Sequence, residues 1–317
     1  MTSDQLRFPH EYTSSVNATP LAGRDVLEGH EPPKIALIYD FDKTLSTSNM
    51  QDYSFIPGVN STPAEFWTEV TEFVQREQMD SILGYMYLMI RKSRQADKPI
   101  RREDFRALGK DIEYFPGVID WFARMNAFGI QSGARIEHYI ISSGLKEIIE
   151  GSKLAHVFKR VYACEFLYDV NGVASWPKVS VNYTGKTQYL FRINKGVLDP
   201  SDDVRMNAYT PEDDRPIPFR NMIYLGDGLT DVPCMRLVKD YGGKSIAVAH
   251  EGSQAVAEEL LINGRVNFVA DADYREGSDL DVLTKRIILQ MIRADELVDH
   301  ENHQKSLIGL GADRSEK

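Results

Sequence analysis

A short apolar run that ends in two aspartates constrains the fold of this chain more than any other feature. Residues 34–40 (KIALIYD) are apolar at nearly every position and run into the loop DFDKTLSTS. Such a run is typical of a strand in a parallel sheet that is covered on both faces, because neither side of the strand then meets water. The sequence therefore predicts a buried strand whose carboxyl end presents Asp40, Asp42 and Thr44.

The remainder of the chain alternates between expected strands and expected helices. Strands are expected at 138–142, 221–225, 245–249 and 266–269, and the Asn171-Gly172 pair predicts a hairpin between 161–169 and 173–181. Helices are expected within 63–95 and at 101–112, 116–128, 187–193 and 280–293, whereas 198–218 is expected to be a loop. This alternation predicts an α/β fold with a Rossmann-like parallel sheet as its core.

One stretch after the first strand lacks strand signals. Between residues 46 and 114 the apolar positions recur at helical spacing, as Phe66, Val70 and Phe73 do. We expect a helical domain inserted at this point. The expected division is an N-terminal arm at 1–33, the α/β core at 34–48 and 115–299, the helical insertion at 49–114, and a loose C-terminal tail at 300–317.

Charge and composition restrict the kinds of molecule that the protein is expected to bind. The 317 residues carry a net charge of -10, and 42% are hydrophobic, which suits a globular chain with a sizeable core. An acidic surface repels nucleic-acid phosphates and anionic lipids, so we expect no nucleic acid and no membrane as a partner. Cys164 and Cys234 give no disulfide framework and no signal peptide pattern opens the chain, so a cytoplasmic location is expected. Nothing in the composition indicates an oligomeric state.

Polar residues gather where three of the expected strands end. Because parallel strands present their carboxyl ends at one edge of a sheet, these residues are expected to lie together. Several carboxylates on short side chains would repel one another without a cation, and hard oxygen ligands suit Mg²⁺. The residues that follow the three strands are Asp40, Asp42 and Thr44; Ser142, Ser143 and Gly144; and Gly226, Asp227, Gly228 and Asp231.

Four motifs in a fixed order carry a resemblance to a known family. They are DFDKT from Asp40, an apolar strand that ends at Ser142, a lysine at a helix start in TGKTQYL (Lys186), and GDGLTD around Asp227. With these motifs the chain resembles the haloacid dehalogenase-like hydrolases over residues 34 to about 274, close to the phosphoserine-phosphatase-like branch. The resemblance implies that the helical insertion is a cap over the substrate.

The resemblance also implies a reaction and a role for each residue. It implies a magnesium-dependent phosphatase that forms an aspartyl-phosphate and takes a small phosphorylated metabolite as substrate. Asp40 would be the nucleophile, Asp42 the general acid, and Lys186 the cation that neutralises the phosphoryl group. The remaining roles are phosphate binding by Thr44, Ser142, Ser143 and Gly144, metal binding by Asp40, Asp42 (through its carbonyl) and Asp227, and orientation of Lys186 or a metal-bound water by Asp231.

Several alternatives stay open at the level of the sequence. Lys178 and Lys195 lie near enough to compete with Lys186 for the role of the active-site lysine. Asn49 stands where phosphoserine phosphatases usually carry a glutamate, which favours a phosphomonoester other than phosphoserine. Leaving-group contacts are expected from the cap, whose basic residues include Arg91, Lys92 and Arg94. The alternative functions are a phosphotransferase or mutase of the same family and a catalytically silent phosphate-binding module.

Overall fold

The fold is built on one largely parallel sheet. A computed structural model describes residues 31–308, and within them the strand order is β4-β3-β2-β1-β5-β6-β7. Neighbouring strands are parallel except for β3 and β4, which form an antiparallel hairpin at one edge. The strands are β1 (Lys34–Tyr39), β2 (Arg135–Leu145), β3 (Arg160–Tyr168), β4 (Ala174–Val179), β5 (Met222–Gly226), β6 (Lys244–Ala249) and β7 (Phe268–Asp271).

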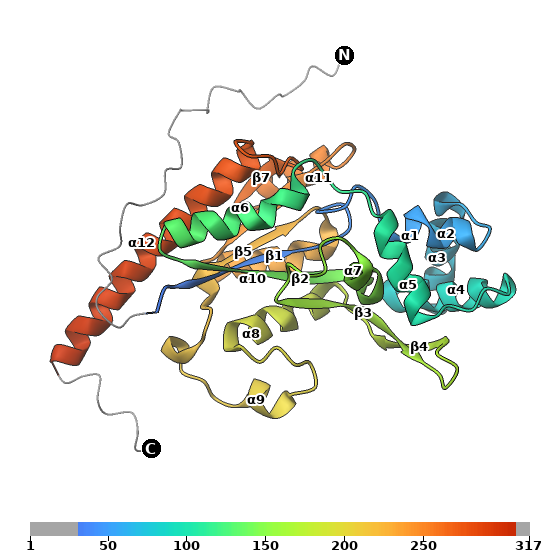
Figure 1. The fold of residues 1–317 in the computed structure, drawn as a ribbon, viewed down its shortest axis with the longest axis horizontal. Coiled ribbons are helices and arrows are strands. Elements are labelled where there is room, and N and C mark those ends of the chain that lie inside the picture. Colours follow the sequence, from blue (N-terminus) through green and yellow to red (C-terminus); the bar gives the residue numbers. More distant parts are fainter. Residues whose placement is uncertain (1–30, 309–317) are drawn as a thin grey trace, which may run out of the picture.

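Helices cover both faces of this sheet, as Figure 1 shows. One face carries α6 (Val118–Gln131) and α12 (Asp279–Leu307), and the other carries α8 (Thr187–Lys195) and α10 (Val232–Asp240). The central strand β1 is therefore enclosed, and Ile35 to Tyr39 are 0% exposed. Two further helices, α7 (Lys146–Gly151) and α11 (Gln254–Ile262), follow β2 and β6. The expected α/β fold with a Rossmann-like parallel sheet is confirmed.

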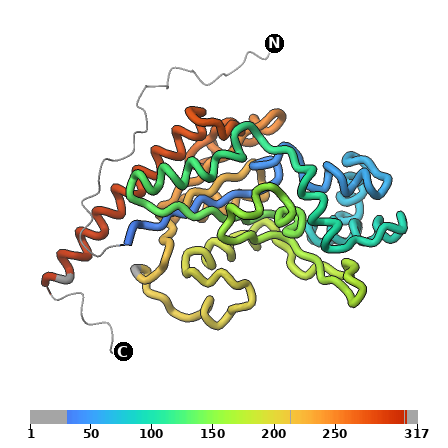
Figure 2. The backbone as a smooth tube through the Cα atoms, in the orientation of Figure 1, coloured from blue at the N-terminus to red at the C-terminus, as the bar shows by residue number. Residues whose placement is uncertain are grey.

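The segment after β1 folds into helices that extend to one side of the sheet (Figures 1 and 2). These are α1 (Met50–Tyr53), α2 (Phe55–Gly58), α3 (Pro63–Glu77), α4 (Ser81–Gln95) and α5 (Arg102–Leu108), called the cap below. Local sequence fixes where the longer ones begin. The side chains of Thr62 and Glu65 accept from each other's backbone N–H groups at the start of α3, and the Asp80 carboxylate accepts from the N–H groups of Ile82 and Leu83 in the first turn of α4.

The C-terminal end differs from the expectation. Helix α12 continues to Leu307, so residues 300–307 are helical and the expectation of a loose tail there is wrong. The apolar pattern ends near Ile292, but Asp295 is bound by Arg220 and Asn221 of the core, which anchors the next turn. The expected arm at 1–30 and the last residues, 309–317, lie outside the described part of the chain. Within residues 31–308, no helix combines the length and the apolar character needed to cross a bilayer.

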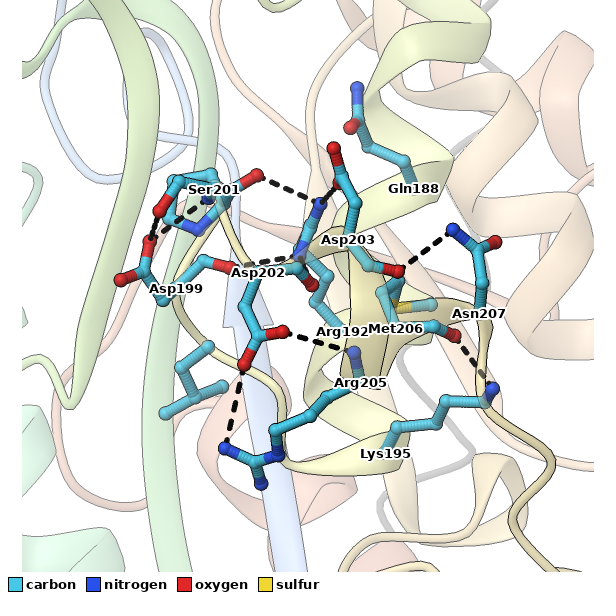
Figure 3. Close-up of polar contacts among 12 residues, drawn as sticks. Gln188, Arg192, Lys195, Asp199, Ser201, Asp202, Asp203, Arg205, Met206 and Asn207 are labelled. Carbon is cyan, nitrogen blue, oxygen red and sulfur yellow. Dashed lines mark hydrogen bonds and ion pairs between the residues drawn. The ribbon is translucent and has the colours of Figure 1, made fainter.

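The segment expected to be a loop, 198–218, contains the short helix α9 (Asp203–Asn207). No residue of α9 is buried, so apolar packing does not hold this helix in place. The loop is held instead by Arg192, a buried residue of α8 (Figure 3). Its guanidinium donates to the carbonyls of Asp199, Pro200 and Asp202 and to the Asp203 carboxylate. The sequence pattern could not show this loop structure, because an arginine of the preceding helix supplies the bonds.

Candidate active site

The site lies where the carboxyl ends of β1, β2 and β5 meet. Strand β1 lies between β2 and β5, so the strand order reverses direction along the chain at β1. Open α/β sheets bind ligands at such a switch point. The three polar loops named in the sequence therefore converge as expected.

The turn after β1 is tight, and backbone hydrogen bonds fix its conformation. Leu45 and Ser46 both donate their N–H groups to the carbonyl of Phe41, and Lys43 adopts a left-handed conformation with φ 57°. The Asp40 N–H bonds to the Leu225 carbonyl of β5 at 2.9 Å, which ties the start of the turn to the neighbouring strand. The loop therefore has little freedom to move relative to the sheet.

Asp40 and Lys186 form a buried ion pair in this site. The Nζ of Lys186 donates to Asp40 Oδ1 at 3.1 Å, and the two residues are 0% and 5% exposed. Burial, together with the charges of Asp231 and Asp227, raises the pKa of Asp40 from 3.8 to about 7, although Lys186 opposes the shift. Burial lowers the pKa of Lys186, but Asp231 and Asp40 raise it by more, so this lysine stays charged.

The two competing lysines lie elsewhere. Lys178 is an exposed residue of β4 whose Nζ pairs with Glu165 at 2.6 Å. Lys195, at the end of α8, donates to the carbonyls of Met206 and Ala208, both at 2.8 Å. Of the three lysines, the structure thus brings only Lys186 to Asp40.

Asp231 is a second acidic partner of Lys186. The Asp231 Oδ1 atom accepts from Lys186 Nζ at 2.7 Å and from the hydroxyl of Tyr224 at 2.7 Å. The other oxygen, Oδ2, is buried and has no hydrogen-bond partner among residues 31–308. A Cβ at Gly226 would lie 2.6 Å from that oxygen, so glycine is required where the carboxylate packs against the strand end. Tyr224 was not among the expected site residues, because it lies within an apolar strand and the sequence pattern does not indicate a polar role for it.

The cap, and not the core, holds the second aspartate of the first motif. The backbone N–H of Met50, the first residue of α1, donates to Asp42 Oδ1 at 2.9 Å. Burial and the neighbouring Asp40 raise the pKa of Asp42 well above its ordinary value. Asp42 therefore holds a proton more tightly than an ordinary aspartic acid.

Hydroxyl groups and a glycine line the opposite side of the site. Thr44 is 0% exposed and its Oγ1 has no hydrogen-bond partner within the described residues; the same holds for the buried Oγ of Ser143. Ser142 Oγ accepts from the Gly144 N–H at 3.0 Å, so that N–H is engaged. A Cβ at Gly144 would lie 2.2 Å from Met50 Cε and 2.9 Å from Asp42 Oδ2. The two orphan hydroxyls are free donors for an anionic ligand.

The carboxylates could hold a metal ion. Asp40, Asp227 and Asp231 each place an oxygen within 4.8 Å of the others. Lys186 alone cannot neutralise three carboxylates, and all three offer the hard oxygen ligands that Mg²⁺ prefers. Asp231 Oδ1 already accepts two hydrogen bonds, so its other oxygen, Oδ2, is the one left to bind a cation. The Asp42 side chain is not part of this oxygen cluster, which leaves its backbone carbonyl for the expected metal role.

His250 lies beside the acidic cluster, and the sequence analysis did not name it as a site residue. Its Nε2 is 3.5 Å from Asp227 Oδ2, and its ring stacks on Phe115 with centroids 6.0 Å apart. The contact with Asp227 raises the pKa of His250, while partial burial opposes the shift. The residue follows β6, so its position after a strand end was the signal that could have placed it here.

The cap contacts the site through apolar and hydroxyl groups more than through its basic residues. Tyr85 of α4 donates to the Ser143 carbonyl at 2.7 Å. Arg91 and Lys92, expected near the leaving group, both pair with Glu69 of α3, and Arg94 lines a separate cavity of about 200 Å³ beside the β3–β4 hairpin. The structure therefore does not bring these three cations to the strand ends.

Comparison with known proteins agrees with this geometry. The model of the haloacid dehalogenase-like hydrolase family (HAD) matches residues 37–236. An uncharacterized protein of Borreliella burgdorferi is 31% identical over 273 residues, covering 78% of this chain and 93% of that protein. The family match spans the loops that carry Asp40, Ser142, Lys186 and Asp227.

Two solved structures share the fold at low sequence identity. A HAD family hydrolase from Salmonella enterica serovar Typhi superposes with a TM-score of 0.53 at 16% identity, covering 81% of this chain and 72% of that one. A substrate-bound phosphoserine phosphatase gives 0.52 at 15% identity, with 81% and 99% covered. Together with the family match, these similarities show that the chain belongs to the haloacid dehalogenase-like hydrolase family.

Proposed function

We propose that this protein is a magnesium-dependent phosphatase that hydrolyses a small phosphomonoester through a phosphorylated Asp40. The observation that carries the proposal is the pairing of Asp40 with the buried Lys186 at 3.1 Å, next to a second carboxyl, Asp42, that the cap holds separately. Asp40 is thus paired with a cation, whereas Asp42 accepts a hydrogen bond from a backbone N–H of the cap. A nucleophile and a general acid need different environments of this kind.

The first half of the reaction breaks the ester bond. Asp40 in its ionised form attacks phosphorus and forms an acyl phosphate, while Lys186 offsets charge on the phosphoryl oxygens. The protonated Asp42 donates its proton to the leaving alcohol. In this proposal the hydroxyls of Thr44, Ser142 and Ser143 would donate to the phosphoryl oxygens.

The second half returns the free enzyme. Asp42, now ionised, takes a proton from water, which attacks the phosphoryl group and releases Asp40 and inorganic phosphate. Asp40, Asp227 and the Asp42 carbonyl would hold Mg²⁺, with Asp231 behind Lys186. The cation supplies charge neutralisation that brings the phosphate dianion next to the carboxylates.

The test is phosphate release from a panel of small phosphomonoesters, in Mg²⁺ and in EDTA, by wild type and Asp40→Asn. We expect turnover that needs the metal and disappears in the variant. Equal turnover by Asp40→Asn would remove Asp40 as nucleophile. Transfer to added alcohols in place of water would indicate a phosphotransferase, and tight vanadate binding without turnover of any ester would indicate a silent binding module.

A further inference from the structure

Tyr224 is a buried polar residue whose position the proposed reaction does not yet explain. It lies on β5, a strand next to the centre of the sheet, and is 0% exposed. Its hydroxyl donates to Asp231 Oδ1 at 2.7 Å. A tyrosine hydroxyl placed inside a sheet is costly unless it is bonded, so this contact is the reason that a tyrosine fits here in place of phenylalanine.

The hydroxyl meets the carboxylate oxygen that also binds the active-site lysine. Asp231 Oδ1 receives Lys186 Nζ at 2.7 Å, and the same Nζ reaches Asp40 at 3.1 Å. The four groups therefore form one chain of bonds, from the Tyr224 hydroxyl to the Asp40 carboxylate. On its other side the Asp231 carboxylate packs against Gly226, where there is no room for a Cβ.

Through this series of hydrogen bonds, the Tyr224 hydroxyl can influence the position of the Lys186 ammonium group. Lys186 is shared between two acidic partners, and its place relative to Asp40 depends on where the Asp231 oxygen lies. Without the hydroxyl, Oδ1 has one fixed donor fewer and the carboxylate can rotate about its Cβ–Cγ bond. The lysine would follow it, and misplacement of a charged group by a fraction of an ångström is enough to slow phosphoryl transfer.

We propose that Tyr224 is a positioning residue, which fixes Asp231 so that Lys186 is held against Asp40. This inference rests on the proposed phosphatase function. Because Tyr224 is fully buried and its hydroxyl bonds Asp231, we expect it to act through Asp231 and not by touching the substrate. Its removal should therefore slow the chemical step and leave substrate affinity almost unchanged.

The first test replaces the hydroxyl alone. Tyr224→Phe keeps the ring and should lower kcat roughly ten- to a hundredfold, the effect of one lost hydrogen bond to a charged group, with little change in KM. The matched control is Tyr139→Phe, since Tyr139 is equally buried and its hydroxyl also donates to a carboxylate, Glu137, at 2.6 Å. Both variants lose a buried hydrogen bond, but only Tyr224→Phe should lose kcat.

The second test asks whether the effect passes through Asp231. In an Asp231→Asn background, adding Tyr224→Phe should cost no further kcat, because the charged acceptor is already gone. Losses that multiply in the double variant, or a Tyr224→Phe enzyme with wild-type kcat, would overturn the inference while leaving an active phosphatase. A wild-type protein that turns over no ester in Mg²⁺ removes the proposed function, and this inference with it.

Discussion

The backbone N–H of Met50 donates a 2.9 Å hydrogen bond to Asp42 Oδ1, so a residue of the cap holds the carboxyl that is proposed to act as the acid. Met50 also accepts the Leu145 N–H through its sulfur at 3.0 Å, which ties α1 to the end of β2. The cap is thereby joined to two loops of the site at once. A movement of α1 away from the sheet would break the hydrogen bond that Met50 donates to Asp42.

The first prediction concerns Asp42→Asn. The amide oxygen of asparagine can still accept the Met50 N–H, so we expect an unfolding free energy at least equal to that of wild type. It cannot donate the proton that the leaving alcohol needs, so kcat should fall roughly a hundred- to ten-thousandfold. The measurement is phosphate release from an alkyl phosphate, with urea unfolding as the stability check.

The leaving group provides the control for this variant. A nitrophenolate departs without protonation, so 4-nitrophenyl phosphate should lose much less rate than the alkyl ester does. An equal loss with both substrates would argue that Asp42 holds the site together and does not act as the acid.

The sequence predicted the parts of the site that belong to a single strand end. Asp40, Ser142 and Asp227 each follow an apolar run, and the rule that parallel strands end at one edge was enough to bring them together. Lys186 was named by its motif position, and the structure places it beside Asp40. These residues depend on local pattern and on the order of the strands, both of which can be read along the chain.

The remaining parts depend on contacts that no local pattern encodes. Met50 acts through its backbone N–H, a group that every residue except proline has, so the residue type does not reveal the contact. Tyr224 lies within an apolar run, so the sequence predicts only that it belongs to a buried strand. The end of α12 was missed because Asp295 is anchored by Arg220 of a different element, 75 positions away in the chain. The domain boundaries at 48–49 and 114–115 stay a prediction.

A pH dependence follows from the raised pKa of Asp40. The folded protein holds the Asp40 proton up to about pH 7, whereas the unfolded chain releases it near the ordinary value of 3.8. The folded state therefore loses stability as pH rises from about 4 to about 7. Asp40→Asn cannot ionise, so its stability gain over wild type should grow across this range and level off above it. Urea unfolding in EDTA at pH 5, 6, 7 and 8 measures the difference.

Mg²⁺ should offset the loss of folding stability that is expected at high pH. A cation bound to ionised Asp40 stabilises the folded wild type, and more so as pH rises, because proton and metal compete for the carboxylate. The variant, which lacks that ligand charge, should gain less from the metal. A stability difference that is flat with pH in EDTA would show that Asp40 is already ionised in the folded protein without metal.

Gly144 offers a test of how closely cap and core fit at the site. In Gly144→Ala the new methyl group would meet Met50 Cε at 2.2 Å and Asp42 Oδ2 at 2.9 Å. The Met50 side chain can move aside, so the cost in stability should stay near 1–3 kcal/mol, but Asp42 would be displaced and kcat should fall. Gly58→Ala is the control, because nothing lies within 4 Å of its Cβ position and it is also in the cap. Full activity of Gly144→Ala would show that the site tolerates a looser contact between α1 and β2.

Arg192 tests a part of the molecule away from the site, the loop in Figure 3 that apolar packing does not hold. Arg192→Met keeps the buried stem and removes donors to the carbonyls of Asp199 and Pro200 at 2.9 and 3.0 Å. Carbonyls left without their charged donor should cost about 2–4 kcal/mol of unfolding free energy. Arg205→Met removes only an exposed pair, 3.6 Å from Asp202, and should change stability by about 0.5 kcal/mol or less. Similar effects of the two variants on urea unfolding would mean that solvent replaces Arg192 in the loop and that the guanidinium does not hold it.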